Sequence, residues 1–129
     1  MAVRIVRLGT PRLPGEGSRL GTVRHLPRGV RKADYAKRDY FDVWLPELSP
    51  SPKLVSFALR EALTPQDWRK FAAAYRREMS QPSPRRLIAL LAALSRQTDF
   101  SVGCYCEDES HCHRSVLREL LRERGAHLK

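Results

Sequence analysis

Twelve consecutive residues, CYCEDESHCHRS at positions 104–115, concentrate most of the reactive side chains of this protein. They contain all three cysteines and two of the four histidines of the chain, together with three acidic residues and one arginine. Thiols and imidazoles act as nucleophiles, as acid–base groups or as metal ligands, whereas arginine binds anions. The segment therefore indicates a functional site, and three kinds of site have to be compared.

The first candidate is an anion-binding site at the start of a helix. The segment follows a strand pattern and precedes a helix pattern, and ligands of open α/β sheets bind at the carboxyl ends of strands. A helix N-terminus presents unpaired N–H groups and a partial positive charge. Because Arg114 lies in the first helical turn, it can hold a phosphate or carboxylate through two parallel N–H donors.

The second candidate is a catalytic thiol. Cys112 lies near the helix start and beside His113, and both features favour the thiolate form. Cys106, at the end of the strand pattern, is the other candidate nucleophile, and Glu107 and His113 are candidate acid–base or orienting groups. The alternative is that the cysteines are inert and partly buried.

The third candidate is a zinc site. Five residues of the segment are zinc-type ligands: Cys104, Cys106, His111, Cys112 and His113. Structural zinc sites, however, usually use two cysteine or histidine pairs that are far apart in the sequence, and no second pair lies outside this segment. We therefore predict no metal and no cofactor, and we expect Cys104 to point into the core as a small apolar residue.

A basic run, RHLPRGVRK at 24–32, is a second candidate part of the site. Arg24 and Arg28 follow a short strand pattern at 20–26, and the carboxyl ends of parallel strands meet at one edge of the sheet. The turn residues Pro27 and Gly29 would fix the position of Arg28. We therefore expect Arg24 and Arg28 to approach the same anion as Arg114.

The elements that must position these residues form an α/β pattern. Strand patterns at 3–8, 20–26 and 99–106 are separated by a breaker-rich loop at 9–21 and by helical stretches, which favours parallel pairing. We predict one domain over residues 1–129, with a short, mainly parallel sheet flanked by about five helices.

The helix boundaries carry specific signals. Ser51, Thr64 and Ser83 each precede a proline, which is typical of a capped helix start. Gly125 marks the end of a last helix. The helix that follows Thr64 carries a one-sided apolar stripe. Its members are Trp68, Phe71, Ala72, Tyr75 and Met79.

The composition indicates a globular protein and gives no sign of a membrane protein. The 129 residues are 42% hydrophobic and 29% charged, which is typical of one globular domain. No apolar run approaches the roughly 20 residues of a membrane span, and the first residues do not form a secretion signal. We therefore predict a cytoplasmic protein with reduced cysteines and no membrane partner.

The net charge is +10, and ten of the 24 basic residues but only two of the 14 acidic ones lie in the first 38 positions. Such a segment attracts phosphate-bearing partners. An alternative function is therefore non-catalytic nucleic-acid binding by the basic N-terminal part, although no known reading module is visible. A zinc-stabilised domain is another alternative.

Four segments together resemble the YeaO-like proteins, the bacterial family of domain of unknown function 488. They are VRHLPRGVRKADYA, FDVWLPELSPS, DWRKFAAAYRREM and CYCEDESHCHRSVLRELL, within about Val3 to Leu121. The resemblance implies a small α/β layered domain without a settled activity, and one pocket shared by the Pro27–Gly29 turn and the cysteine segment. The chain has His25 and Leu26 where the family pattern leads us to expect Leu-Trp.

The leading hypothesis is thus an enzyme or binding protein for a phosphorylated or otherwise anionic small molecule, such as a nucleotide. Arg24, Arg28 and Arg114 would bind the anion. Any chemistry would be carried by Cys106, Glu107, Cys112 and His113.

Overall fold

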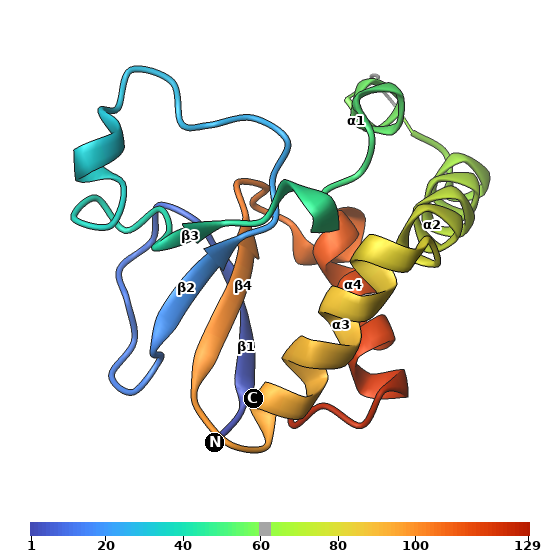
Figure 1. The fold of residues 1–129 in the computed structure, drawn as a ribbon. Coiled ribbons are helices and arrows are strands. Elements are labelled where there is room, and N and C mark those ends of the chain that lie inside the picture. The colour runs from blue at the N-terminus through green and yellow to red at the C-terminus, as the bar shows by residue number, and fades with distance from the viewer. Residues whose placement is uncertain (60–62) are drawn as a thin grey trace.

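A computed structural model describes residues 1–59 and 63–129 of the protein. Within these residues, four strands form one parallel sheet in the order β1-β4-β2-β3, and helices pack beside it (Figure 1). The strands are β1 (Val3–Arg7), β2 (Ser18–Gly21), β3 (Val43–Trp44) and β4 (Phe100–Cys104). The helices are α1 (Pro52–Ala58), α2 (Pro65–Met79), α3 (Pro82–Ser95) and α4 (His113–Glu123), and short 3-10 turns lie at Lys32–Asp34, Pro46–Leu48 and Glu109–His111. The predicted α/β fold with a parallel sheet is confirmed.

Two of the three predicted helix starts are confirmed. The hydroxyl of Ser51 accepts a hydrogen bond from a backbone N–H in the first turn of α1, and that of Thr64 does the same in α2. The third was wrong, because α3 begins at Pro82 after Gln81, which leaves Ser83 inside the first turn. Pro82 already supplies a fixed φ at the first helical position, so the helix starts two residues earlier than the Ser83 signal indicates. Gly125, at a φ of +79°, follows the end of α4 as predicted.

The strands differ more from the sequence prediction. The second strand is Ser18–Gly21, whereas the pattern placed it at 20–26, and the two-residue strand β3 was not predicted. β3 consists of exposed residues at the edge of the sheet, so no alternation of buried and exposed side chains marks it.

The main core lies between the sheet and helices α2, α3 and α4. All five residues of β4 are buried, because this strand lies between β1 and β2 and is covered on both faces. Val3 and Val102 pack in one cluster with Phe71, Tyr75 and Leu117 of the helices. β4 is therefore the most enclosed strand of the sheet. In the described residues, no helix has the length and apolar character needed to cross a bilayer.

A buried ion pair organises the irregular segments around β2. The side chains of Glu16 and Arg19 are each 1% exposed, and two Arg19 nitrogens donate to the Glu16 carboxylate at 2.7 and 2.9 Å. A third Arg19 nitrogen donates to the backbone carbonyls of Thr10 and Asp39. The hydroxyl of Ser101, on β4, donates to Glu16 at 2.8 Å. The pair thus joins two loops to the central strand.

We expect the Glu16→Gln substitution to destabilise the protein by about 3–5 kcal/mol at neutral pH, because it leaves the Arg19 charge buried without its partner. Urea denaturation measures this loss. Burial alone would raise the pKa of Glu16, but hydrogen bonds from Arg19, Ser101 and the Leu13 amide lower it to about 2.

The pH dependence of this effect has a definite sign. Because the folded-state pKa of Glu16 lies below its usual value of 4.5, its stabilisation is complete above that value and is lost as the pH falls toward about 2. The difference in unfolding free energy between the wild type and Glu16→Gln should therefore shrink over this range. A constant difference would contradict the assignment.

A pair of glycine substitutions tests the close contact that precedes β2. Gly17 and Gly15 both have positive φ angles, of +77° and +74°. A Cβ atom at Gly17 would lie 2.0 Å from the carbonyl oxygen of Asp99, whereas a Cβ at Gly15 would meet nothing within 4 Å. Both alanine variants carry the left-handed backbone cost of roughly 1–2 kcal/mol. We expect Gly17→Ala to have a clearly lower Tm than Gly15→Ala, and equal Tm values would contradict the contact.

Candidate active site: three thiols in an apolar cavity

A cavity of about 270 Å³ opens at the carboxyl ends of the central strands, next to the start of α4. One wall is apolar, with Val55 and Ala58 of α1, the adjacent Leu59, and Phe71 of α2. The other side is formed by polar and thiol-bearing residues. They are Arg24, His25, Cys104, Tyr105, Cys106, His111, Cys112 and His113. Strand ends and a helix start thus meet at the edge of the sheet where parallel α/β proteins bind ligands.

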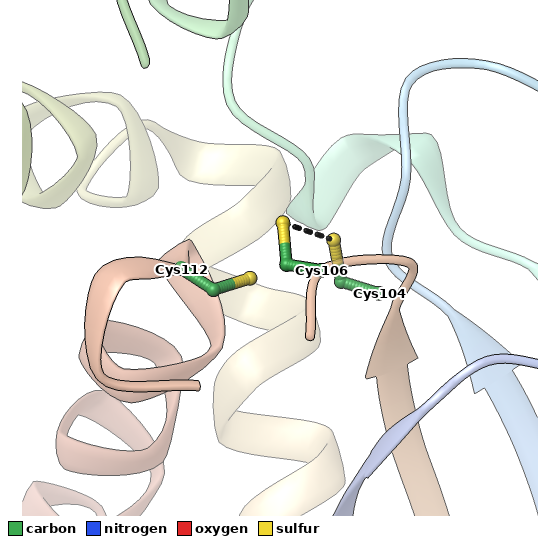
Figure 2. Close-up of side chains that lie close together, drawn as sticks. All are labelled: Cys104, Cys106 and Cys112. Atoms are coloured by element: carbon green, nitrogen blue, oxygen red, sulfur yellow. Dashed lines mark hydrogen bonds between the residues drawn. The ribbon is translucent and has the colours of Figure 1, made fainter. Parts of the chain in front are cut away.

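The three cysteines form one cluster in this cavity. Their sulfur atoms all lie within 4.8 Å of one another, and none forms a disulfide. Figure 2 shows Cys104 and Cys106 near the end of β4, with Cys112 at the start of α4 directing its sulfur toward them. The Cys104 thiol donates a hydrogen bond to the Cys106 sulfur at 3.7 Å. Cys106 is exposed, whereas Cys104 and Cys112 are buried.

The environment places the negative charge of the cluster on Cys106. Hydrogen bonds from the Cys104 and Cys112 thiols lower the pKa of Cys106 to about 3, against the opposing effect of partial burial, and the positive charge of Arg114 contributes. The same hydrogen bond raises the pKa of Cys104 far above its usual value, because loss of its proton would break the bond. The surroundings of Cys106 therefore favour its thiolate form, and Cys104 is the hydrogen-bond donor to it.

His113 adds a base beside the third thiol. Its Nε2 lies 2.8 Å from the carbonyl oxygen of Thr22, and because a carbonyl only accepts, Nε2 must carry a proton. Nδ1 of the neutral ring is then free to accept, and it lies 3.7 Å from the Cys112 sulfur. Hydrogen bonding with Cys104 and the contact with His113 lower the pKa of Cys112. Thr22 thus fixes the tautomer that makes His113 a proton acceptor for Cys112.

The helix start and a backbone contact fix the positions of the cysteines. Cys112 is the N-cap residue of α4, and no side chain caps the helix there, so its sulfur lies at the positive end of the helix dipole. Arg114, in the first turn, is 3% exposed, and its guanidinium donates to the backbone carbonyl of Cys106. Its Nε is buried without a hydrogen-bond partner in the described residues. Arg114 therefore connects the helix start to the loop that carries the exposed thiol.

The polar rim of the cavity is also fixed by backbone contacts. The Arg24 guanidinium donates from Nε and Nη2 to the carbonyls of Ser49 and Pro50, at 3.2–3.3 Å. The Tyr105 hydroxyl donates to the carbonyl of His25 at 2.9 Å. Arg24 is thus held at the cavity by two of its three nitrogens.

Residues 3–125 match the model of the DUF488-N3a family, which is described as the active DUF488-N3 subclade. The chain belongs to the DUF488-N3a family. This confirms the resemblance to YeaO-like proteins. No curated protein and no solved structure matches the chain.

The structure of this DUF488-N3a protein brings together four of the seven site residues named from the sequence. Cys106, Cys112, His113 and Arg24 line the cavity. They come from the end of β4, the start of α4 and the segment after β2, and the parallel sheet brings these three places to one edge.

The other three predicted site residues lie elsewhere. Arg28 is exposed and is not among the lining residues, and Arg114 is buried behind the Cys106 loop. The side chain of Glu107 is 83% exposed and faces Arg7 at 3.6 Å. The structure therefore does not bring Arg28 and Arg114 to one cavity. Arg28 is exposed, and the guanidinium of Arg114 is used to bind the backbone carbonyl of Cys106. The Pro27–Gly29 turn does not line the cavity either.

The sequence reasoning missed the parts played by Cys104 and Thr22. Cys104 and Cys106 lie two positions apart in the strand pattern at 99–106, so strand alternation puts them on one face, and this is the signal that could have paired their thiols. The argument against zinc considered only spacing along the chain. It could not show that Cys112 returns to the strand end, where one thiophilic ion could reach all three sulfurs. The absence of a bound metal stays a prediction.

The hydrogen bond from Cys104 can be tested through the reactivity of Cys106. With iodoacetamide, the wild-type alkylation rate at Cys106 should stay flat from neutral pH into the acidic range, because the thiolate is already fully formed. In Cys104→Ala, the rate should begin to fall at a higher pH than in the wild type, because the pKa of Cys106 rises when the donor is lost. A hydrogen bond to a charged group contributes about 1.5–3 kcal/mol, or roughly one to two pKa units.

Cys104→Ser is the matched control, because its hydroxyl keeps a donor near Cys106. Peptide mass spectrometry identifies the alkylated cysteine, and circular dichroism checks that the variants are folded at each pH. The same pH profile in Cys104→Ala and in the wild type would contradict the assigned charge distribution.

Proposed function

We propose that this DUF488-N3a protein is a thiol-dependent enzyme in which Cys106 attacks an electrophilic atom of a small anionic molecule. The observation that carries the proposal is the cluster itself. One exposed thiol lies with two buried thiols, all within 4.8 Å, in an apolar cavity at the edge of the sheet. The description of the family as an active subclade supports a catalytic role.

The surroundings of Cys106 suit a nucleophile. A thiolate is the reactive form of cysteine, and here it is favoured by the Cys104 donor and by the positive charge of Arg114. Exposure on the cavity side gives a substrate access to the sulfur. In the reaction, the Cys106 sulfur forms a covalent bond to the electrophilic atom and the leaving group departs with the bonding electron pair.

The lining indicates the class of substrate. The wall of Val55, Ala58, Leu59 and Phe71 suits an apolar or flat group. At the rim, Arg24 lines the cavity, and its Nη1 has no hydrogen-bond partner in the described part of the chain. A phosphate or carboxylate could therefore bind Arg24 while the rest of the molecule packs on the apolar wall. A phosphorylated small molecule such as a nucleotide combines these two properties.

The test compares two electrophiles that differ in charge, the anion iodoacetate and the neutral iodoacetamide. In the wild type both should modify Cys106, with iodoacetate favoured by the positive rim. In Arg24→Leu the ratio of the iodoacetate rate to the iodoacetamide rate should fall about fivefold to tenfold, which corresponds to roughly 1 kcal/mol of lost attraction. Mass spectrometry at timed intervals gives both rates.

Arg28→Leu is the matched control, because it removes the same charge from the same segment but from outside the cavity. Its rate ratio should stay at the wild-type value. Equal ratios for both variants would remove Arg24 as the anion site, and lack of reaction at Cys106 with either reagent would refute the proposed nucleophile.

A further inference from the structure

Attack by Cys106 alone does not use the neighbouring pair of Cys112 and His113. Both residues are buried, at 2% and 6% exposure, yet both line the cavity. The sulfur of Cys112 has the Nδ1 of His113 on one side, at 3.7 Å, and the Cys106 sulfur within 4.8 Å on another. A buried thiol with its own base, aimed at the attacking sulfur, is arranged to react with that sulfur.

We propose that the anionic substrate of this site carries a sulfur–sulfur bond and that Cys112 resolves the mixed disulfide formed on Cys106, so that the protein reduces small organic disulfides that carry an acidic group. The proposal rests on the proposed function and names the substrate class of the same site. The contact that carries it is the approach of two thiols of different exposure, with an imidazole on the buried one.

The first step is attack by the Cys106 thiolate on one sulfur of the substrate. A bond forms between the Cys106 sulfur and that sulfur, the substrate S–S bond breaks, and the second sulfur leaves as a thiolate that takes a proton from solvent. Thiolate attack of this kind is the general route of thiol–disulfide exchange. Cys106 is the cysteine exposed to an entering molecule.

In the second step, the Cys112 thiol passes its proton to Nδ1 of His113, and its sulfur attacks the Cys106 sulfur. The bond between Cys106 and the substrate sulfur breaks, and the second half of the substrate leaves as a thiolate that takes the proton from His113. The substrate gains two electrons and becomes two thiols, while Cys106 and Cys112 become a disulfide. A dithiol reductant returns this disulfide to two thiols by the same exchange.

Cys112 suits the resolving step better than Cys104 does. Cys104 is also close to Cys106, but no imidazole is in hydrogen-bond contact with Cys104 in the described residues, whereas Nδ1 of His113 lies 3.7 Å from the Cys112 sulfur. The carbonyl of Thr22 keeps the His113 ring in the tautomer that accepts the Cys112 proton. The three thiols therefore have separate parts: Cys106 attacks, Cys104 donates a hydrogen bond, and Cys112 resolves.

A disulfide fits this cavity better than hydrogen peroxide does. The space of about 270 Å³ and the apolar wall accommodate an organic group on either side of an S–S bond. Hydrogen peroxide has no apolar part that this wall could bind. Hydrogen peroxide is therefore the competing oxidant in a parallel sample of the test.

The fully reduced, full-length protein is mixed with 2-hydroxyethyl disulfide without air, and intact mass is followed over time. The wild type should pass through a species heavier by one half of the disulfide and end as a species lighter by two hydrogen atoms. Cys112→Ser should stop at the heavier species, and Cys106→Ser should form neither. Cys112→Ala gives a second, apolar replacement in case the serine variant does not fold.

Arg28→Leu is the control, because it changes an exposed residue outside the cavity and should form the internal disulfide as the wild type does. An internal disulfide in both Cys112 variants, a mixed disulfide that persists in the wild type, or a faster reaction with hydrogen peroxide would overturn the proposal. Iodoacetamide labelling of the same samples separates the two proposals. Labelling of Cys106 without resolution by Cys112 refutes only the disulfide substrate, whereas absence of both refutes the thiol enzyme as well.

Discussion

The site depends on one constraint: β4 is an interior strand of a parallel sheet, between β1 and β2. Because all neighbours run in the same direction, the ends of β2 and β4 reach one edge together, and the chain leaving β4 passes through a loop and the 3-10 turn Glu109–His111 to α4, which starts beside these ends. Complete burial of β4 leaves that strand few ways to shift. Cys104 at its last residue and Cys112 at the helix start are thereby held on either side of the loop that carries Cys106.

The three cysteines of the cluster have identical side chains but differ in exposure and in hydrogen bonding. A single negative charge in an apolar cavity is costly unless it is paired or hydrogen-bonded. Here the exposed Cys106 has a thiol donor in Cys104 and the positive charge of Arg114 nearby, whereas the buried Cys112 has an imidazole. Chemical difference among the cysteines thus comes from their surroundings, and the proposed reaction depends on this difference.

The arginines also differ from one another in what their guanidinium groups contact. Basic residues dominate the first part of the chain, yet several of them serve the fold rather than a ligand. In that part Arg19 is enclosed with Glu16, and in the last part of the chain Arg114 is buried against the Cys106 carbonyl. Two nitrogens of Arg24 also hold backbone carbonyls, and its side chain lines the cavity. A positive net charge is therefore a weak guide to ligand binding in this protein, because the guanidinium group is as useful for satisfying buried carbonyls as for holding an anion.

The sequence by itself determined the class of fold, two of the capped helix starts, the end of α4 and the segment that carries the thiols. These features depend on neighbouring residues: alternation in strands, a hydroxyl before proline, and glycine after a helix. The same local reasoning placed α3 too late and missed β3, whose two exposed residues are defined only by their pairing with β2.

Only the tertiary structure decided which reactive residues share a cavity. Local sequence places Cys112 eight positions from Cys104, and it does not reveal that their sulfurs lie within 4.8 Å. Nor does it distinguish Arg24, which lines the cavity, from Arg28, which does not. The physical reason is that side-chain neighbours across a strand–loop–helix junction are set by the packing of the whole sheet and its helices, and that packing joins residues as distant as Thr22 and His113.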